Sequence, residues 1–235
     1  MKKTLLTLIM LCIVFLAHAQ NVDTMYVYNI DGSVHKFEVE KIERIAFTAS
    51  IGEAIDLGLS VKWASYNVGA TAPEEAGGYY NWGETEEREK YAQIEYKFYD
   101  KTEHIFTKYS NDDGKTTLEP EDDVAHVKWG GNWRMPTATE LEELCNNCTW
   151  EWTTLNGIKG HKVTGPNGNS IFLPVTGRKI LEGIAGENNG YYWSSSFGGS
   201  DNTIAVCLGT GSYFYSVGDG GAYRYQGRVV RPVCE

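Results

Sequence analysis

The stretch "GGNWRMPTATELEELC", residues 130–145, decides the fold. Thr137 and Glu140 have the spacing of a capping box, in which the Thr137 hydroxyl accepts from the Glu140 amide and the Glu140 carboxylate accepts from the Thr137 amide. Apolar residues at i, i+3 and i+4 follow within residues 141–145 and form one helix face. The sequence therefore predicts a helix that begins after Thr137 and packs through this face.

An extended lead-in precedes the helix. Trp133 and Met135 alternate with Arg134, so their side chains can face the core while Arg134 points the other way, towards a carboxylate. A lone arginine in such a lead-in is more often structural than catalytic. The residues that we expect to fix the fold are Trp133, Arg134, Pro136, Thr137 and Glu140.

Around this helix the chain is rich in Gly, Tyr and Trp, with short apolar segments separated by turns. Runs of this kind, bounded by Gly, Asn and Pro, are typical of short strands. The predicted strands lie at residues 60–68, 77–84, 162–166, 170–175, 190–196, 204–210, 212–217 and 228–233.

Residues 1–19 have the pattern of a secretory signal peptide, cut before Gln20. Two lysines precede an apolar run over about residues 5–16, and a small-x-small end follows. The run falls short of the roughly 20 residues that a membrane-spanning helix needs. Because Leu11 stands before Cys12, where a lipoprotein signal has a small residue, we expect export without a lipid.

Charge and apolar content limit the partners. Removing residues 1–19 deletes two lysines and no acids, so the formal net charge moves from −10 to −12. Nucleic acid and anionic membrane surfaces are therefore poor partners. No second long apolar run follows, so we expect no membrane span. The mature protein is expected in the periplasm, at the cell surface or outside the cell.

Residues 20–50 are expected to form a separate small β unit. Within them, residues 24–48 contain two alternating strands around Asp31-Gly32, a dipeptide that tolerates the positive φ angles of a tight hairpin. Such a unit is too small to hold a core alone. A larger domain is predicted over residues 51–235.

Four cysteines remain after the predicted cleavage. In an exported chain an even number favours disulfides over metal, and four cysteines allow three connectivities. The Cys-x-x-Cys at 145–148 also has redox and zinc interpretations, but it lacks a βαβ setting or a second Cys-x-x-Cys. The disulfide candidates are Cys145, Cys148, Cys207 and Cys234.

Several segments, taken in order, resemble one known family. They are "DLGLSVKWASYNVGA" (56–70), "GGYYNWGET" (77–85), "PEDDVAHVKWGGNWRMPTATELEELC" (120–145), "CTWEW" (148–152), "NGNSIFLPVTG" (167–177), "GYYWSSS" (190–196) and "GRVVRPVC" (227–234). Over residues 54–235 the chain resembles the Fibrobacter succinogenes major paralogous domain family, which is common in exported proteins of gut Bacteroidetes.

The resemblance implies the C-type lectin fold, whose superfamily also holds sulfatase-modifying factors and retroelement-diversified receptors. The predicted class is therefore α+β: a C-type-lectin-like domain of small twisted antiparallel sheets, one or two helices and long loops, preceded by the hairpin unit. In C-type lectins a bridge often ties the first helix to the last strand, which would join Cys145 or Cys148 to Cys234. Local pairing of Cys145 with Cys148 would instead leave Cys207 for Cys234.

Patterns of catalysis are weak in this chain. The sulfatase-modifying factors rely on reactive cysteines near the chain end, and here Cys207 and Cys234 lack the surrounding pattern. The histidines stand singly without metal-ligand spacing, and the serines at 194–196 lack a Gly-x-Ser-x-Gly elbow. We therefore expect no enzyme activity and no catalytic residue.

An acidic segment at residues 111–123 offers the oxygen ligands that Ca²⁺ prefers. Its spacing is not that of an EF-hand, and the Glu-Pro-Asn and Trp-Asn-Asp signatures of calcium-dependent sugar-binding lectins are absent. A solvated acidic loop is therefore the favoured interpretation, and we expect no cofactor, with calcium the one ion considered. The weak calcium candidates are Asp112, Asp113, Glu121, Asp122 and Asp123.

Residues 187–228 combine tyrosines with Ser, Gly, Asn and Asp, a mixture typical of antibody binding loops. Tyr faces also stack on sugar rings. Alternation in "SYFYSV" (212–217) puts Tyr213 and Tyr215 on one face and Phe214 on the other. The predicted ligand-binding residues are Tyr213, Tyr215, Tyr223, Arg224, Tyr225, Asp201 and Asn202.

The sequence thus predicts an exported, non-catalytic recognition or adhesion protein that binds a glycan or protein through its C-terminal loops. One alternative is a structural or assembly subunit of a bacterial surface polymer, with the N-terminal hairpin pairing to a partner strand. A less favoured alternative is an enzyme of the sulfatase-modifying type.

Overall fold

A computed structural model describes residues 24–28, 33–38, 51–198, 201–218 and 220–235. The chain divides into two compact units between Phe47 and Thr48. The predicted signal peptide at residues 1–19 and the Asp31-Gly32 turn lie outside the described residues. In the described part of the chain, no helix has both the length and the apolar character needed to cross a membrane.

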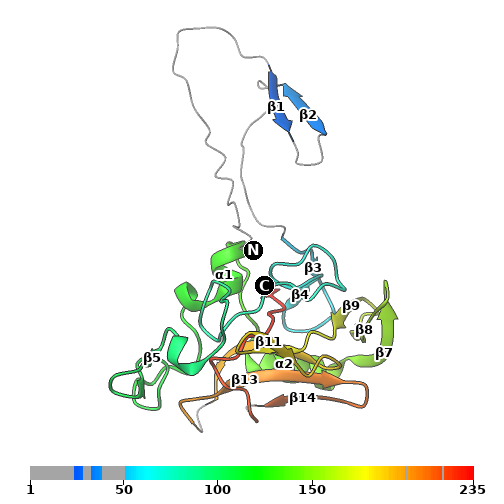
Figure 1. Cartoon of the computed structure of the whole chain (residues 1–235). Helices are drawn as coiled ribbons and strands as arrows, with labels where there is room; N and C mark the ends of the chain where they lie inside the picture. The colour runs from blue at the N-terminus through cyan, green and yellow to red at the C-terminus, as the bar shows by residue number, and fades with distance from the viewer. Residues whose placement is uncertain (1–23, 29–32, 39–50, 199–200, 219) are drawn as a thin grey trace, which may run out of the picture. The chain divides into compact units, whose positions relative to one another are not determined.

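The first unit contains a two-stranded antiparallel hairpin (Figure 1). Strand β1 (Thr24–Tyr28) pairs with β2 (Val34–Glu38), with Tyr26 opposite Lys36. The two strands predicted for this segment are confirmed. Within the described residues neither strand pairs with a third. A hairpin of this size is marginally stable by itself in water.

The second unit is α+β, with short antiparallel strands and two α-helices among its described residues. The helices are α1 (Val124–Trp129) and α2 (Ala138–Asn147). The sheets are β3 (Ala54–Ile55) with β4 (Lys62–Ala64) and β15 (Val233–Cys234); β5 (Tyr99–Asp100) with β6 (Ile105–Phe106); β7 (Thr149–Leu155) with β8 (Ile158–Thr164) and β9 (Ser170–Pro174); β10 (Arg178–Ile180) with β11 (Gly183–Ala185); and β12 (Gly190–Phe197) with β13 (Ala205–Gly211) and β14 (Phe214–Gly218).

Helix α2 begins where the sequence predicts. Thr137 caps it, and the reciprocal hydrogen bonds of the capping box with Glu140 are both present. The Arg134 guanidinium donates to both Glu140 oxygens, at 2.8 and 2.6 Å, which confirms the expected carboxylate partner. Leu141 and Leu144 are buried against the β12–β13–β14 sheet. The stretch at 130–145 is therefore a structural bracket.

The remaining lead-in residues also have structural positions. Met135 is buried, and Trp133 packs edge-on against Trp129 with ring centroids 5.1 Å apart. The Pro136 carbonyl accepts from the Ser195 amide at 2.7 Å. This bond joins the start of α2 to strand β12.

Helix α1 is an element that the sequence analysis did not predict as a helix. Its six residues are too few to show an apolar period, so only its cap marks it. The Asp123 carboxylate accepts from the Ala125 and His126 amides and, through its other oxygen, from the Met135 amide. Asp123 is therefore a helix cap that also holds the lead-in of α2, and not part of an open cation loop.

The predicted strand at 77–84 is wrong. Within this segment only Tyr80 forms a β-bridge, with Arg228, while Gly77 and Gly83 adopt positive φ angles. Aromatic residues in a glycine-rich loop imitate a strand pattern here. At 228–233 the prediction holds only for Val233 in the short β15, because Arg228 and Val229 form isolated bridges and residues 230–232 belong to no strand.

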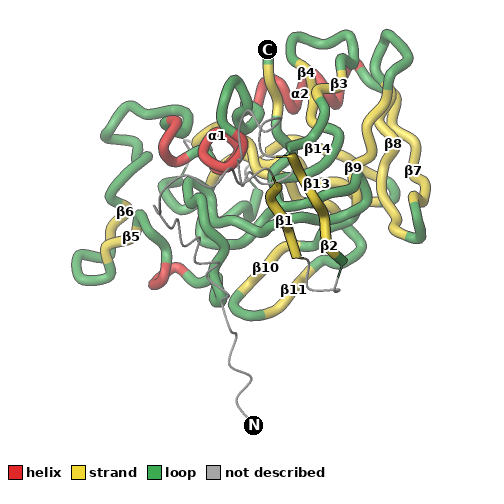
Figure 2. Tube along the Cα trace, turned by 90° about the horizontal axis from the view of Figure 1, so that it is seen from above, coloured by secondary structure: helices red, strands yellow, loops and turns green. Residues whose placement is uncertain are grey.

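The β7–β8–β9 and β5–β6 sheets lie on opposite sides of the domain, with the helices between them (Figure 2). The β12–β13–β14 sheet has two different faces. Tyr192, Leu208 and Val217 share one face and pack in the cluster that contains the buried leucines of α2. The register places Tyr191, Cys207, Gly209, Ser216 and Gly218 on the other face. We call this second face the outer face.

Replacing Glu140 tests the bracket. Burial alone would raise the pKa of Glu140, but the hydrogen bonds from Arg134 and Thr137 bring it below its ordinary value. Its stabilising effect is therefore present above the unfolded-state pKa of Glu and is lost as the pH falls through the folded-state value. At neutral pH we expect Glu140→Gln, which keeps a capping acceptor, to lower the unfolding free energy by about 1 kcal/mol. Glu140→Ala should lower it by about 2 kcal/mol.

Chemical denaturation at neutral and acidic pH measures this difference. The difference in unfolding free energy between the parent chain and Glu140→Gln should become smaller in acid, because protonation of Glu140 then removes the same charge. An unchanged difference would show that the ion pair with Arg134 does not contribute.

Candidate functional site

The predicted tyrosines divide between two places. Tyr213 lies in the turn between β13 and β14 and is 98% exposed. Tyr215 is half-exposed and stacks on Trp150 of β7, with ring centroids 4.3 Å apart and an interplanar angle of 12°. This pair joins the last sheet to the β7–β8–β9 sheet.

Tyr223 and Tyr225 form a second stack, with centroids 5.3 Å apart. Tyr223 bridges to Ile204, just before β13 begins, whereas Tyr215 pairs with Thr210 near its other end. At a rise of about 3.3 Å per residue, the two tyrosine pairs are roughly 20 Å apart along β13. The structure does not bring them into one site.

Asp201 and Asn202 lie in the loop before β13, near Tyr223. The Asp201 carboxylate accepts from the Thr203 amide at 2.7 Å, so it closes its own turn. The Asn202 side-chain oxygen accepts from the Asn111 amide at 2.9 Å. Both residues hold loops in place, and Asp201 is exposed.

Arg224 does not reach the surface. Its side chain is fully buried, with its guanidinium carbon 4.9 Å from the ring centroid of Trp82 and 5.1 Å from that of Phe106. Its nitrogens donate to Tyr96 Oη and to the carbonyls of Lys108, Tyr109 and Asn202. The structure therefore corrects its expected role: Arg224 ties four segments together and is not on an exposed binding face.

Arg231 and Arg228 are also buried, but they differ in their partners. Each guanidinium nitrogen of Arg231 donates to an oxygen, from Asn67 and from main-chain carbonyls. Arg228 is only 2% exposed, and its Nη2 alone donates, to Gly221 and Gln226. Its Nε and Nη1 have no hydrogen-bond partner. Its guanidinium carbon lies over the Trp193 ring, 4.3 Å from the centroid, which offsets part of the cost of burying a cation with two nitrogens that have no acceptor.

Arg228 lines an open hollow of about 280 Å³ on the outer face of the β12–β13–β14 sheet. We call this hollow the arginine pocket. Glycines leave its floor without side chains: a Cβ on Gly209 would meet only the Phe214 ring, at 3.8 Å, and one on Gly218 would meet nothing within 4 Å. The lining residues are Arg178, Tyr191, Cys207, Gly209, Phe214, Ser216, Gly218, Gly220, Gly221 and Arg228.

Positive charge is concentrated in this pocket. Lys179 of β10 forms an antiparallel bridge with Gly227, so the next register position sets Arg178 opposite Arg228. Arg178 lies over the Tyr191 ring at 4.7 Å, and its Nε is also buried without a partner. Like charges directly opposite each other destabilise adjacent strands.

No carboxylate offsets the pair within the described residues. Neither Arg178 nor Arg228 forms an ion pair there. Burial lowers the pKa of Arg228 from its ordinary value; Cys207 raises it, and the charge of Arg178 lowers it further. The arrangement is that of a site ready to accept negative charge.

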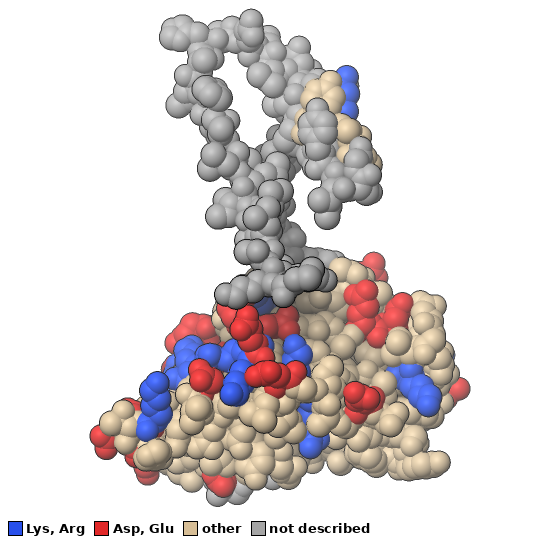
Figure 3. All heavy atoms as spheres, in the orientation of Figure 1, with Lys and Arg blue, Asp and Glu red and all other residues tan. Residues whose placement is uncertain are grey.

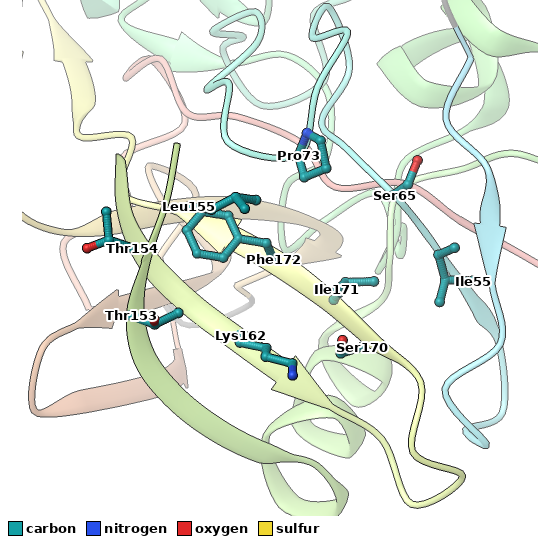
Figure 4. A pocket seen from close by; sticks show the side chains of 10 residues that line it. All are labelled: Ile55, Ser65, Pro73, Thr153, Thr154, Leu155, Lys162, Ser170, Ile171 and Phe172. Carbon is teal, nitrogen blue, oxygen red and sulfur yellow. The ribbon is translucent and has the colours of Figure 1, made fainter. Parts of the chain in front are cut away.

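A second hollow, of about 420 Å³, lies beside the β7–β8–β9 sheet (Figure 4). Ile55, Leu155, Ile171 and Phe172 give it apolar walls, and the Lys162 side chain lies at its rim. None of its lining atoms is a buried polar group without a partner. This second hollow is concave, but it has no buried polar group that lacks a hydrogen-bond partner. It is therefore the weaker candidate for a ligand site.

The acidic candidates are partly gathered and largely neutralised. Glu119, Glu121 and Asp122 have oxygens within 4.8 Å of one another. Lys108 contacts all three, and Lys97 lies 2.6 Å from Asp122. Figure 3 shows Lys and Arg side chains mixed with Asp and Glu on the side of the domain that carries α1 and β5. A cation here would compete with lysines that already occupy the cluster.

The outlying candidates Asp112 and Asp113 are exposed. Asp113 accepts from the Tyr109 and Lys115 amides and so holds its own turn.

The four described cysteines form no disulfide with one another. Burial raises the pKa of Cys145 to about 12, and it also raises the pKa values of Cys148 and Cys234. These groups are therefore protonated thiols at neutral pH, and poor nucleophiles. The disulfide pairing expected of an exported chain stays a prediction.

Sequence reasoning missed both residues that make the pocket, Arg178 and Arg228. For Arg228 the available signal was the arginine density of residues 224–231, three arginines in eight residues of an acidic chain. Comparison with known proteins adds no assignment: no family model, curated protein or solved structure matches this chain.

Proposed function

We propose that this chain is an exported, non-catalytic recognition protein with a C-type-lectin-like domain, which binds a glycan or protein ligand at the outer face of the β12–β13–β14 sheet. The observation that carries the proposal is the arginine pocket, an open hollow of about 280 Å³ with buried, unpartnered donors. Concave sites with a few convergent polar groups are the usual form of a ligand site. Apart from Arg178, the pocket lies within residues 187–228, the region that the sequence singled out for recognition, but none of the seven predicted ligand-binding residues lines it.

The chemistry of the pocket supports binding rather than catalysis. Its donors are two guanidinium groups, which remain protonated in proteins and do not exchange protons at neutral pH. Among the residues that line the pocket there is no histidine, lysine, aspartate or glutamate. The lining groups can hold and orient a ligand.

A glycan array and a protein pull-down with the folded full chain test the proposal. Binding should be lost in Gly209→Leu, because a Cβ there meets only the Phe214 ring, at 3.8 Å, and the rest of the side chain would occupy the pocket. It should be kept in Tyr223→Ala, which alters the tyrosine stack and removes no residue that lines the pocket. Circular dichroism confirms that both variants fold. Silence of folded parent protein in both screens, or equal binding by Gly209→Leu, would count against the proposal.

A structural or assembly role is the second candidate, and the β1–β2 hairpin favours it. A two-stranded sheet that pairs with no third strand among the described residues can accept a strand from a partner. Deleting residues 20–50 would then abolish assembly in a surface-polymer assay while leaving ligand binding intact. Normal assembly of the shortened chain would remove this role.

A further inference from the structure

We infer that the arginine pocket binds an oxyanion, which is a carboxylate or sulfate group of a single acidic sugar. This inference rests on the recognition role proposed above and names its ligand class. Two positive groups line the hollow, and the described residues supply no carboxylate to pair with them. An incoming oxyanion would accept from the partly exposed Arg178 guanidinium and would offset the buried charge of Arg228, whose Nε and Nη1 have no acceptor.

Comparison of the three buried arginines shows that Arg228 is different in kind. Arg224 and Arg231 use every guanidinium nitrogen on oxygens of the chain itself. The fold can thus satisfy a buried guanidinium completely with its own oxygens, most of them main-chain carbonyls. Arg228 is left incomplete at the place where the protein opens into a hollow. A negative charge held in that hollow would therefore offset a cation that the described chain leaves incompletely satisfied.

The shape and surroundings of the pocket favour a sugar over a peptide side chain or a polyanion. Phe214 at its rim is 48% exposed and offers an aromatic surface, and the exposed Ser216 adds a hydroxyl. A bare glycine floor allows a flat ring to approach the sheet. The chain carries a formal charge of −10, which repels an extended polyanion at long range. One local charge on a compact ring fits these conditions.

The test titrates the full chain with methyl glucuronide, glucose 6-sulfate, methyl glucoside and inorganic sulfate, using isothermal titration calorimetry. We expect one or both acidic sugars to bind at least tenfold more tightly than methyl glucoside and inorganic sulfate. Arg178→Gln should weaken that binding at least tenfold. Lys101→Gln removes an exposed charge in the turn between β5 and β6 and should change it less than twofold. Because Arg228 is buried, Arg178 is the variant that carries the test.

Each other outcome overturns the inference. If inorganic sulfate binds as tightly as the acidic sugars, the pocket does not recognise the sugar. If the neutral glucoside binds tightly, the pocket does not require the oxyanion. If Gly209→Leu abolishes binding of a neutral glycan or protein that Arg178→Gln still binds, the recognition role stands and the oxyanion inference fails. Acidic-sugar binding that survives both Gly209→Leu and Arg178→Gln would place it outside this pocket.

Discussion

The Arg224→Met variant is expected to lose about 4 kcal/mol of unfolding free energy, because Tyr96 Oη and the carbonyls of Lys108, Tyr109 and Asn202 would lose their donor in a dry interior. The methionine also gives up the contact of a cation with the surrounding rings. A domain of this size has about 5–15 kcal/mol in total, so the variant should be close to unfolding at moderate temperature.

The matched control is Arg228→Met, at a position as deeply buried. Arg228 uses only Nη2 in hydrogen bonds within the protein. Its removal relieves the repulsion from Arg178 but also gives up the contact with the Trp193 ring, at 4.3 Å. We expect its unfolding free energy to change by less than about 1 kcal/mol, with either sign. Urea denaturation of both variants measures the contrast. Equal losses would mean that Arg228 is as structural as Arg224, and the case for a ligand at its free nitrogens would then collapse.

The helix start was predictable because its signals are local. The Thr137–Glu140 capping box and the leucines that follow act within a few residues, and the structure places α2 where they indicate. Helix α1 was missed since six residues give no period. The segment at 77–84 misled because its tyrosines and tryptophan suggest a strand, whereas its path is set by glycines in positive φ and by contacts with residue 228.

The site was predictable only to its region of the chain. Residues 187–228 were singled out by composition, and the pocket lies there, apart from Arg178. Sequence alone could not separate Arg224, Arg228 and Arg231, because the difference lies in which distant carbonyls each one meets. Likewise, 50 residues separate Arg178 from Arg228, and only the Lys179–Gly227 bridge brings them opposite each other.

Gly77→Ala is the second large effect that we expect, a loss of about 3 kcal/mol. Gly77 has a φ of 75°, where an L side chain is strained, and its Cβ would lie 2.3 Å from the Val68 carbonyl oxygen. That oxygen already accepts from the Gly78 amide at 2.9 Å, so the backbone at Val68 would have to move.

Gly168→Ala separates the two parts of this loss. Gly168 has a similar φ of 89°, but a Cβ there meets nothing within 4 Å, so only the conformational strain remains and about 1 kcal/mol should be lost. Comparing their denaturation midpoints isolates the steric part. Similar losses from both variants would show that the contact with Val68 relaxes freely.

The backbone shift that the Gly77→Ala side chain forces on Val68 should also affect the arginine pocket. The Val68 amide donates to the Val230 carbonyl at 3.0 Å, two residues from Arg228. A shift of Val68 is therefore passed to the segment that holds the Arg228 guanidinium. Gly77→Ala should weaken ligand binding at a temperature where the variant is still folded, whereas Gly168→Ala should leave it unchanged. If Gly77→Ala lowers the stability but leaves ligand binding unchanged, the displacement at Val68 is not passed on to the pocket.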